Sequence, residues 1–377
     1  MAWSFRRRIK IIPGVHLNFS KNGISTSIGV RGASITFGQK GTYLNTGIPG
    51  TGIYNRQKIS SSQAPPTPTF PETGPWGLPA DNIFSSDVQH ITSQDMQGIK
   101  EAIIAAHQQR KELKVDIRNI RFSLVFSQIK LVTVYLLVVG FLIKSVTKAI
   151  CKEIKDKKEA IRQLDEQIEL CHVKLDVGFD PEIRSLYEKV VNNFKSLTNS
   201  QKIWDVTGAY ANDRVATRSA ASTSVKTTQV HFGIKILEDV RSEFEPLWMK
   251  NAHGSDLYFY PGFVIMFSAG TKFALIGLNE LGFTHNAVKY VETSGVPSDT
   301  KIIDRTWAKV NKNGSPDRRF KDNYEIPVVK YGAILLATET GVHEEYMFSN
   351  YEASEAFARS FSDYQKVIKS LKPIPIT

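Results

Sequence analysis

Apolar and polar residues alternate along residues 15–53, in short runs that glycines separate. Residues 24–28 read ISTSI and residues 33–37 read ASITF. This period of two predicts short β-strands with one apolar face. The glycines recur in two series that each step by nine, namely Gly23, Gly32, Gly41, Gly50 and Gly29, Gly38, Gly47. Because glycine suits tight turns, the pattern predicts an antiparallel β-meander of about five strands within residues 1–59.

Folding these strands back at four-residue turns defines a register. Ile28 then faces Ala33 in one hairpin, and Ile35 faces Leu44 in the next, so that apolar residues share one face. A nonapeptide β-solenoid is the alternative, but the aspartates with which such repeats bind calcium are missing. We therefore expect the meander.

A proline-rich linker over residues 60–94 separates the meander from a helical region over residues 95–201. Apolar residues recur there every seven positions, first at Ile99, Ala106, Leu113, Ile120 and later at Ile154, Ile161, Ile168, Leu175. Such spacing is typical of a coiled coil or a long helical bundle, although Arg110 and Lys157 interrupt it. The pattern favours a helical hairpin, through which the chain is expected to form homo-oligomers.

Residues 131–143, LVTVYLLVVGFLI, are uniformly apolar and have basic residues on both sides. As a helix they would cover only about 20 Å, short of the ~30 Å hydrocarbon core of a bilayer. A segment that dips into one leaflet, with its basic flanks on anionic headgroups, fits this pattern. The alternative is a helix buried between neighbours in a bundle or oligomer. The predicted membrane contacts are Leu136, Leu137, Val138 and Phe141.

Residues 202–377 have the alternation of β-strands and end in an amphipathic helix over residues 350–372, where Ser349 and Glu352 have the spacing of a capping box. Consecutive antiparallel strands closed by a helix predict a barrel or a sandwich-like domain, and an α+β sheet with a packed helix is the alternative. The chain is therefore predicted to be a multidomain α+β protein, divided into residues 1–59, 60–94, 95–201 and 202–377.

The formal net charge of +11 is distributed unevenly, because the first 60 residues contain nine Lys or Arg and no acidic residue. This asymmetry favours an anionic partner, either a membrane surface or nucleic acid. The predicted contact residues of this N-terminal module are Trp3, Arg6, Arg7, Arg8, Lys10, Arg31 and Lys40. The alternative is a solvated basic face, with Trp3 completing the apolar face of the sheet.

Residues 307–323 form a second basic stretch, which contains the turn signals Asn313-Gly314 and Ser315-Pro316. Its cationic residues are Lys309, Lys312, Arg318, Arg319 and Lys321. A loop of this kind is suited to binding a phosphate or a carboxylate. The alternative is a solvated hairpin in which Asp317 pairs with an arginine of the same loop.

Motifs of known catalytic chemistry are missing from the sequence. It contains no P-loop, no HExxH, no CxxC pair and no GxSxG elbow. The only cysteines, Cys151 and Cys171, lie twenty residues apart, and no apolar run of signal-peptide length begins the sequence. We therefore expect a reduced, cytoplasmic protein, peripherally attached to the membrane or fully soluble, without enzymatic activity, cofactor or metal.

The segments FRRRIKIIPGVHLNFSKNGISTSIGVRGASITFG and GIPGTGIY resemble the bacterial family known as domain of unknown function 4236, over about one sixth of the chain. The resemblance implies a small bacterial β module and no established activity. The order of strands and helix after residue 202 is loosely similar to pleckstrin-homology-like domains. The predicted function is an adaptor, sensor or scaffold at the cytoplasmic membrane face, and the alternative is a nucleic-acid-binding protein, for example one that acts in defence against foreign DNA.

Overall fold

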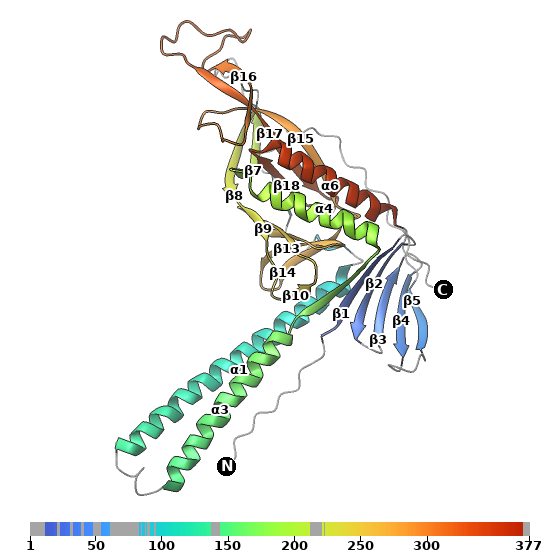
Figure 1. Cartoon of the computed structure of the whole chain (residues 1–377), viewed down its shortest axis with the longest axis vertical. Helices are drawn as coiled ribbons and strands as arrows, with labels where there is room; N and C mark the ends of the chain where they lie inside the picture. Colours follow the sequence, from blue (N-terminus) through green and yellow to red (C-terminus); the bar gives the residue numbers. More distant parts are fainter. Residues whose placement is uncertain are drawn as a thin grey trace.

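The computed structural model has three parts: a small N-terminal sheet, a long helical hairpin, and a larger β-rich region that carries two further helices (Figure 1). The residues that it describes are 12–20, 23–30, 33–38, 41–47, 54–60, 96–136, 144–211 and 223–371, with isolated positions at 83, 85–86, 88, 91–93 and 221. The N-terminal sheet lies beside the root of the hairpin, and the hairpin projects away from the rest of the molecule.

The N-terminal strands form the predicted antiparallel meander. They are β1 (Gly14–Ser20), β2 (Gly23–Val30), β3 (Ala33–Gly38), β4 (Gly41–Gly47) and β5 (Tyr54–Ser60). Two strands from later in the chain extend the sheet beyond β1, first β6 (Val173–Phe179) and then β10 (Val240–Ser242), and each is parallel to its neighbour. The seven-stranded sheet therefore joins segments that are far apart in the sequence.

The register agrees with the prediction in one hairpin and differs in the other. Ile35 lies opposite Leu44 as predicted, but Ile28 lies opposite Ile35 and not opposite Ala33. The reason is that β2 continues to Val30 and β3 begins at Ala33, which leaves two residues between the strands where we expected four. A shift of two positions preserves the face of every side chain. Ile28, Ile35 and Leu44 therefore still share one side of the sheet.

One glycine of the nine-residue pattern is required by a close approach between strands. A Cβ atom at Gly29 would lie 2.3 Å from the carbonyl oxygen of Ala33 and 2.4 Å from the Cα of Ser34. The backbone would have to move to admit it. At Gly14, by contrast, the nearest atom to such a Cβ would be 3.6 Å away.

The predicted helical hairpin consists of α1 (Gln97–Leu136) and α3 (Lys144–Leu170), which pack against each other (Figure 1). Leu113 and Ile120 of the first heptad series lie in their shared core. The second series is wrong at its last member, because Leu175 lies on β6 and is buried in the seven-stranded sheet. The described residues of the region 95–201 are therefore mostly helical, apart from this strand and short connections.

The C-terminal region contains two open sheets, with strand orders β14-β13-β12-β11-β9 and β15-β17-β18-β7-β8, and β16 lies beside β17. The strands are β7 (Ile203–Ala211), β8 (Thr223–Val230), β9 (Phe232–Ile234), β11 (Leu247–Met249), β12 (Asp256–Phe259), β13 (Phe263–Ala269), β14 (Lys272–Gly277), β15 (Gly282–Val291), β16 (Lys301–Trp307), β17 (Glu325–Ala337) and β18 (His343–Phe348). Neither sheet closes on itself within the described residues, so the expectation of a barrel is wrong. The β-rich region that ends in a helix is confirmed.

Two helices pack side by side, namely α4 (Pro181–Thr198) and α6 (Tyr351–Ser370) (Figure 1). Helix α6 lies on β15 and β17 of the six-stranded sheet, whereas α4 contacts β9 and β6. Helix α6 is the predicted terminal helix. Its N-cap is Asn350, whose side-chain oxygen accepts a hydrogen bond of 2.9 Å from the backbone N–H of Ala353. The cap therefore lies one residue later than the predicted Ser349.

One large hydrophobic core connects the N-terminal sheet with the C-terminal region. It includes Phe19 of β1, Tyr187 of α4 and Phe361 of α6. The ring of Phe19 lies 5.0 Å from that of Phe179 on β6, measured between centroids. This core crosses the divisions predicted at residues 59 and 201, and the domain limits stay predictions.

Candidate functional site

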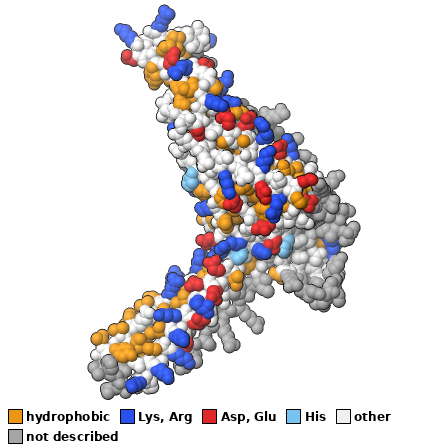
Figure 2. Space-filling model, in the orientation of Figure 1, with side chains coloured by type: hydrophobic (Ala, Val, Ile, Leu, Met, Phe, Trp, Pro, Cys, Tyr) orange, Lys and Arg blue, Asp and Glu red, His pale blue; other side chains and the backbone are white. Residues whose placement is uncertain are grey.

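Helix α1 has a second apolar face, which points away from α3. Val115, Phe122, Ile129 and Leu136 step by seven along it, and all are exposed, Phe122 by 68% and Leu136 by 77%. We define the outer stripe as Val115, Phe122, Val125, Phe126, Ile129, Val132 and Leu136. Figure 2 shows hydrophobic side chains gathered on this part of the hairpin. A contiguous exposed apolar surface of this kind marks a contact site.

The outer stripe lies opposite the side that contacts α3. Ser127 faces α3, because its hydroxyl donates a hydrogen bond of 2.8 Å to the carboxylate of Glu153. At 3.6 residues per turn, Ile129 lies roughly 200° around the helix from Ser127. The packing of the hairpin therefore leaves the stripe uncovered by α3.

Positive charge is concentrated at the free end of the hairpin, which we call the hairpin tip and define as residues 119–136 and 144–158. Residues 119–158 contain eight Lys or Arg and two acidic residues, whereas residues 159–170 contain one Arg and four acidic residues. The exposed cations of the tip include Lys130, Lys144, Lys148, Lys152, Lys155 and Lys158. The outer stripe and this basic surface therefore lie on the same end of the hairpin (Figure 2).

Lys157 interrupts the heptad pattern because it forms a buried polar contact between the two helices. Its Nζ donates to the carboxylate of Glu153 at 2.6 Å and to the hydroxyl of Ser127 at 2.8 Å. Hydrogen bonds from Lys157 and Ser127 hold the pKa of Glu153 below its usual range. A polar contact in an apolar seam selects one alignment of the helices.

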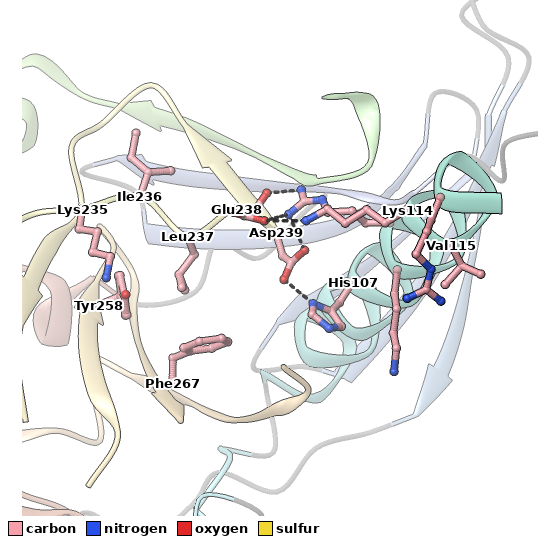
Figure 3. A pocket seen from close by; sticks show the side chains of 13 residues that line it. His107, Lys114, Val115, Lys235, Ile236, Leu237, Glu238, Asp239, Tyr258 and Phe267 are labelled. Atoms are coloured by element: carbon pink, nitrogen blue, oxygen red, sulfur yellow. Dashed lines mark hydrogen bonds and ion pairs between the residues drawn. The ribbon is translucent and has the colours of Figure 1, made fainter. Parts of the chain in front are cut away.

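Arg110, the other interruption, holds the root of α1 against the segment between β9 and β10. Its buried guanidinium donates to the carbonyl oxygen of Cys171 at 2.6 Å and to that of Glu238, and it lies 3.0 Å from Oδ1 of Asp239. The Nδ1 of His107 lies 2.9 Å from Oδ2 of Asp239 (Figure 3). The two charged residues that break the pattern are thus satisfied by specific partners.

A cavity of about 660 Å³, which we call the root cavity, opens beside this contact. His107 projects from α1 toward residues 235–239, and Lys114 and Val115 line the cavity further along the same helix (Figure 3). Its lining residues are His107, Arg110, Lys111, Lys114, Val115, Arg118, Lys235, Ile236, Leu237, Glu238, Asp239, Tyr258 and Phe267. Aromatic and aliphatic walls with several cations make it a candidate binding site among the described residues.

The sequence-predicted contact residues divide into those that the structure describes and those that it does not. The N-terminal set, Trp3, Arg6, Arg7, Arg8, Lys10, Arg31 and Lys40, lies outside the described residues, as do Leu137, Val138 and Phe141. Leu136 is described and belongs to the outer stripe. In the described part of the chain, no helix is both long enough and apolar enough to cross a bilayer.

The basic loop after β16 contains the ion pair between Asp317 and an arginine of the same loop that is expected for a solvated hairpin. The carboxylate of Asp317, which is 1% exposed, accepts hydrogen bonds from Nε and Nη2 of Arg319 at 2.9 and 2.8 Å. Arg319 is therefore engaged within the loop. Lys312, Arg318 and Lys321 are exposed, and anion binding by this loop stays a prediction.

A buried carboxylate pair in the C-terminal region was not predicted. Glu344 of β18 accepts hydrogen bonds from Ser85 at 2.6 Å and Asn251 at 2.7 Å, and Asp205 of β7 accepts one from the backbone N–H of Ala252 at 2.8 Å. Burial raises the pKa of both groups, and that of Glu344 to about 7. Glu344 and Asp205 are nearly inaccessible to solvent, so we assign them to the stability of the region.

Sequence reasoning also missed the root cavity. Arg110 was recognised as a break in the heptad pattern, and the other basic residues of the cavity on α1 only as flanks of the apolar segment. Ile236, Tyr258 and Phe267 lie more than a hundred residues away in the chain. No local pattern indicates that these two sets meet. Among the residues that the structure describes, no group of three His, Cys, Asp or Glu side chains is arranged to hold a metal ion.

Comparison with known proteins agrees with the N-terminal resemblance. Residues 3–56 match the family described as "Protein of unknown function (DUF4236)". The match includes β1 to β4 and the start of β5. No curated protein and no solved structure shows a significant match to the chain.

Proposed function

We propose that this protein is a non-enzymatic adaptor or scaffold that binds an anionic membrane surface through the hairpin tip and holds its β-rich parts near that surface. The observation that carries the proposal is the exposed outer stripe on the same helical end as six exposed lysines. An amphipathic helix with apolar residues on one face and lysines beside them is the usual element of interfacial membrane binding.

The expected energies are sufficient for reversible attachment. Half-burial of five side chains of the outer stripe in the lipid interface would contribute about 5 kcal/mol. Each lysine close to an anionic surface would add about 1 kcal/mol at physiological ionic strength. The acid-free sequence of residues 1–60 would contribute in the same direction. Such binding needs no spanning helix, and it places the protein at the cytoplasmic leaflet, where anionic lipids are concentrated.

A second copy of the chain is the main competing occupant, because heptad spacing also suits helix association. The distribution of charge supports the membrane surface. Packing two hairpin tips together would bring two sets of eight cations and only two acidic residues each into proximity, and like charges at close range oppose association. An anionic lipid surface is complementary to the same charges.

Sedimentation with vesicles tests the proposal. We expect the protein to bind vesicles of phosphatidylcholine with phosphatidylglycerol, and to bind pure phosphatidylcholine much more weakly. Replacing Phe122, Ile129 and Val132 by serine should reduce binding at least tenfold, because these side chains are exposed and make the apolar contact. Replacing Lys148 and Lys152 by glutamine should weaken binding and reduce its dependence on salt.

Matched control variants lie elsewhere on the surface. Serine at Ile302, Ile303 and Tyr324 removes equally exposed apolar side chains of the C-terminal region, and glutamine at Lys189 and Lys366 removes exposed lysines of α4 and α6. Vesicle binding should survive in both. Equal binding to neutral and anionic vesicles would contradict the electrostatic argument. A dimer that the serine variants at the tip dissociate, without any vesicle binding, would assign the stripe to a second copy. Salt-dependent retention on DNA without vesicle binding would favour the nucleic-acid alternative.

A further inference from the structure

The root cavity is a second site, separate from the hairpin tip, and its walls and its rim differ in character. The apolar surface comes from Ile236 and Leu237 in the segment before β10, with Tyr258 of β12 and Phe267 of β13 beside them (Figure 3). Ile236 is 53% exposed at this position. An apolar ligand portion would therefore remove from water a side chain that the described part of the fold leaves open.

The rim carries more cations than its own carboxylates neutralise. Five Lys and Arg residues line the cavity with two carboxylates, Glu238 and Asp239. Both carboxylates are occupied: Arg110 contacts each of them, Lys114 lies 3.6 Å from Glu238, and His107 contacts Asp239. Neither Lys111 nor Arg118 has an ion-pair partner among the residues described, and the Nζ of Lys235 lies 4.6 Å over the ring of Trp248.

We infer that the root cavity binds a small amphipathic anion, a carboxylate or phosphate monoester on an apolar body of medium-chain acyl size. The cavity volume of about 660 Å³ falls within the range of sites for small organic ligands. The apolar body lies against Ile236, Tyr258 and Phe267, and the anionic group meets Lys111 and Arg118. Arginine and lysine at the mouth supply charge-assisted hydrogen bonds to such a group.

This assignment does not depend on membrane binding by the hairpin tip. A ligand in the cavity would affect how two parts of the protein are held together, because the cavity is bounded by α1 on one side and by residues 235–239 on the other. A ligand that contacts both sides adds to the link that Arg110 already makes. Occupancy is therefore expected to slow hydrogen exchange at residues 107–118 and 235–242.

Isothermal titration of the full chain with decanoate tests the inference. We expect saturable binding of one decanoate, weaker binding of decanol, which lacks the charge, and weaker binding of inorganic phosphate, which lacks the apolar body. Replacing Lys111 and Arg118 together by glutamine should reduce decanoate affinity at least tenfold. Replacing Ile236 by serine should weaken decanoate and leave phosphate unchanged. The matched control replaces Lys148 and Lys152, on the same hairpin but outside the cavity, and should bind decanoate like the unchanged protein.

The inference is overturned if decanol binds as tightly as decanoate, or if the Lys111 and Arg118 double variant keeps full affinity. Loss of decanoate binding in a folded Lys148 and Lys152 control variant would also exclude the cavity as the site, because these lysines lie outside it. Competition by a monomeric short-chain phosphatidylglycerol identifies a membrane lipid as the source of the anion, and binding of decanoate without such competition identifies a free carboxylate. Vesicle sedimentation of the same variants keeps this outcome separate from that of the hairpin tip.

Discussion

Replacing Arg110 by methionine should open the root of the hairpin. The guanidinium is buried and contacts four groups, namely the carbonyl oxygens of Cys171 and Glu238 and the carboxylates of Glu238 and Asp239. Methionine has similar length but donates no hydrogen bond, so the two carbonyls would lose this donor and the largely buried Asp239 would lose the guanidinium while keeping its contact with His107. Breaking a buried ion pair on one side costs about 3–5 kcal/mol.

Replacing Lys157 by methionine provides the matched comparison, because it removes the other buried cation of the same hairpin. In this variant the remaining carboxylate, that of Glu153, is 35% exposed and can be solvated by water, while methionine fills an apolar position between the two helices. The expected change is within about 1 kcal/mol, since apolar replacement of such pairs is often nearly neutral. The expected difference in stability between the two variants follows from how deeply the groups that lose their partner are buried, and not from the charge that is removed.

Native-state hydrogen exchange measures both changes, since it reports the free energy of local opening in a protein of several parts. In the Arg110 variant, amides of residues 106–120 and 240–242 should lose about 3–5 kcal/mol of protection. In the Lys157 variant, amides of residues 120–131 and 150–160 should change by less than about 1 kcal/mol. Equal losses in the two variants, or a loss below about 1 kcal/mol for Arg110, would refute this account of the hairpin root.

Two further predictions concern stability. The pKa of Glu344 is raised to about 7 from an ordinary 4.5, so the folded state favours the protonated acid. The contribution of Glu344 to the free energy of unfolding should be complete below pH 4.5 and lost as pH rises toward 7 and beyond, by about 3 kcal/mol in all. Thermal melting of the Glu344→Gln variant should lack this decline in stability, and an unchanged decline would contradict the prediction. Gly29→Ala should destabilise the meander by about 1–3 kcal/mol because its Cβ meets the Ala33 carbonyl at 2.3 Å. The control Gly14→Ala, with its nearest atom at 3.6 Å, should change the melting temperature little, and equal effects of the two changes would contradict the close-approach argument.

Elements with a local period were predictable from the sequence. The alternation around Ile28 and Ile35 identified the meander. The predicted apolar face of the sheet is correct although the turn between β2 and β3 is shorter than predicted, because a shift of two positions leaves each side chain on the same face. Leu113 and Ile120 identified the hairpin seam for the same reason, since 3.5-residue spacing depends only on neighbours in the helix. Leu175 shows the limit, because a heptad position does not reveal that the chain has already left the helix for a strand.

Pairing between distant segments was decided by tertiary structure. Strand β6 joins the N-terminal sheet beside β1 and β10 joins it beside β6, although neither differs in pattern from a strand of another sheet. The burial of Arg110 likewise depends on the loop that carries Glu238 and Asp239, which lies more than 120 residues further along the chain. A sequence specifies which residues prefer water and at what period they recur. Which buried charge meets which carboxylate, and which apolar stripe is left without a partner, is decided only when segments with no local relation pack together.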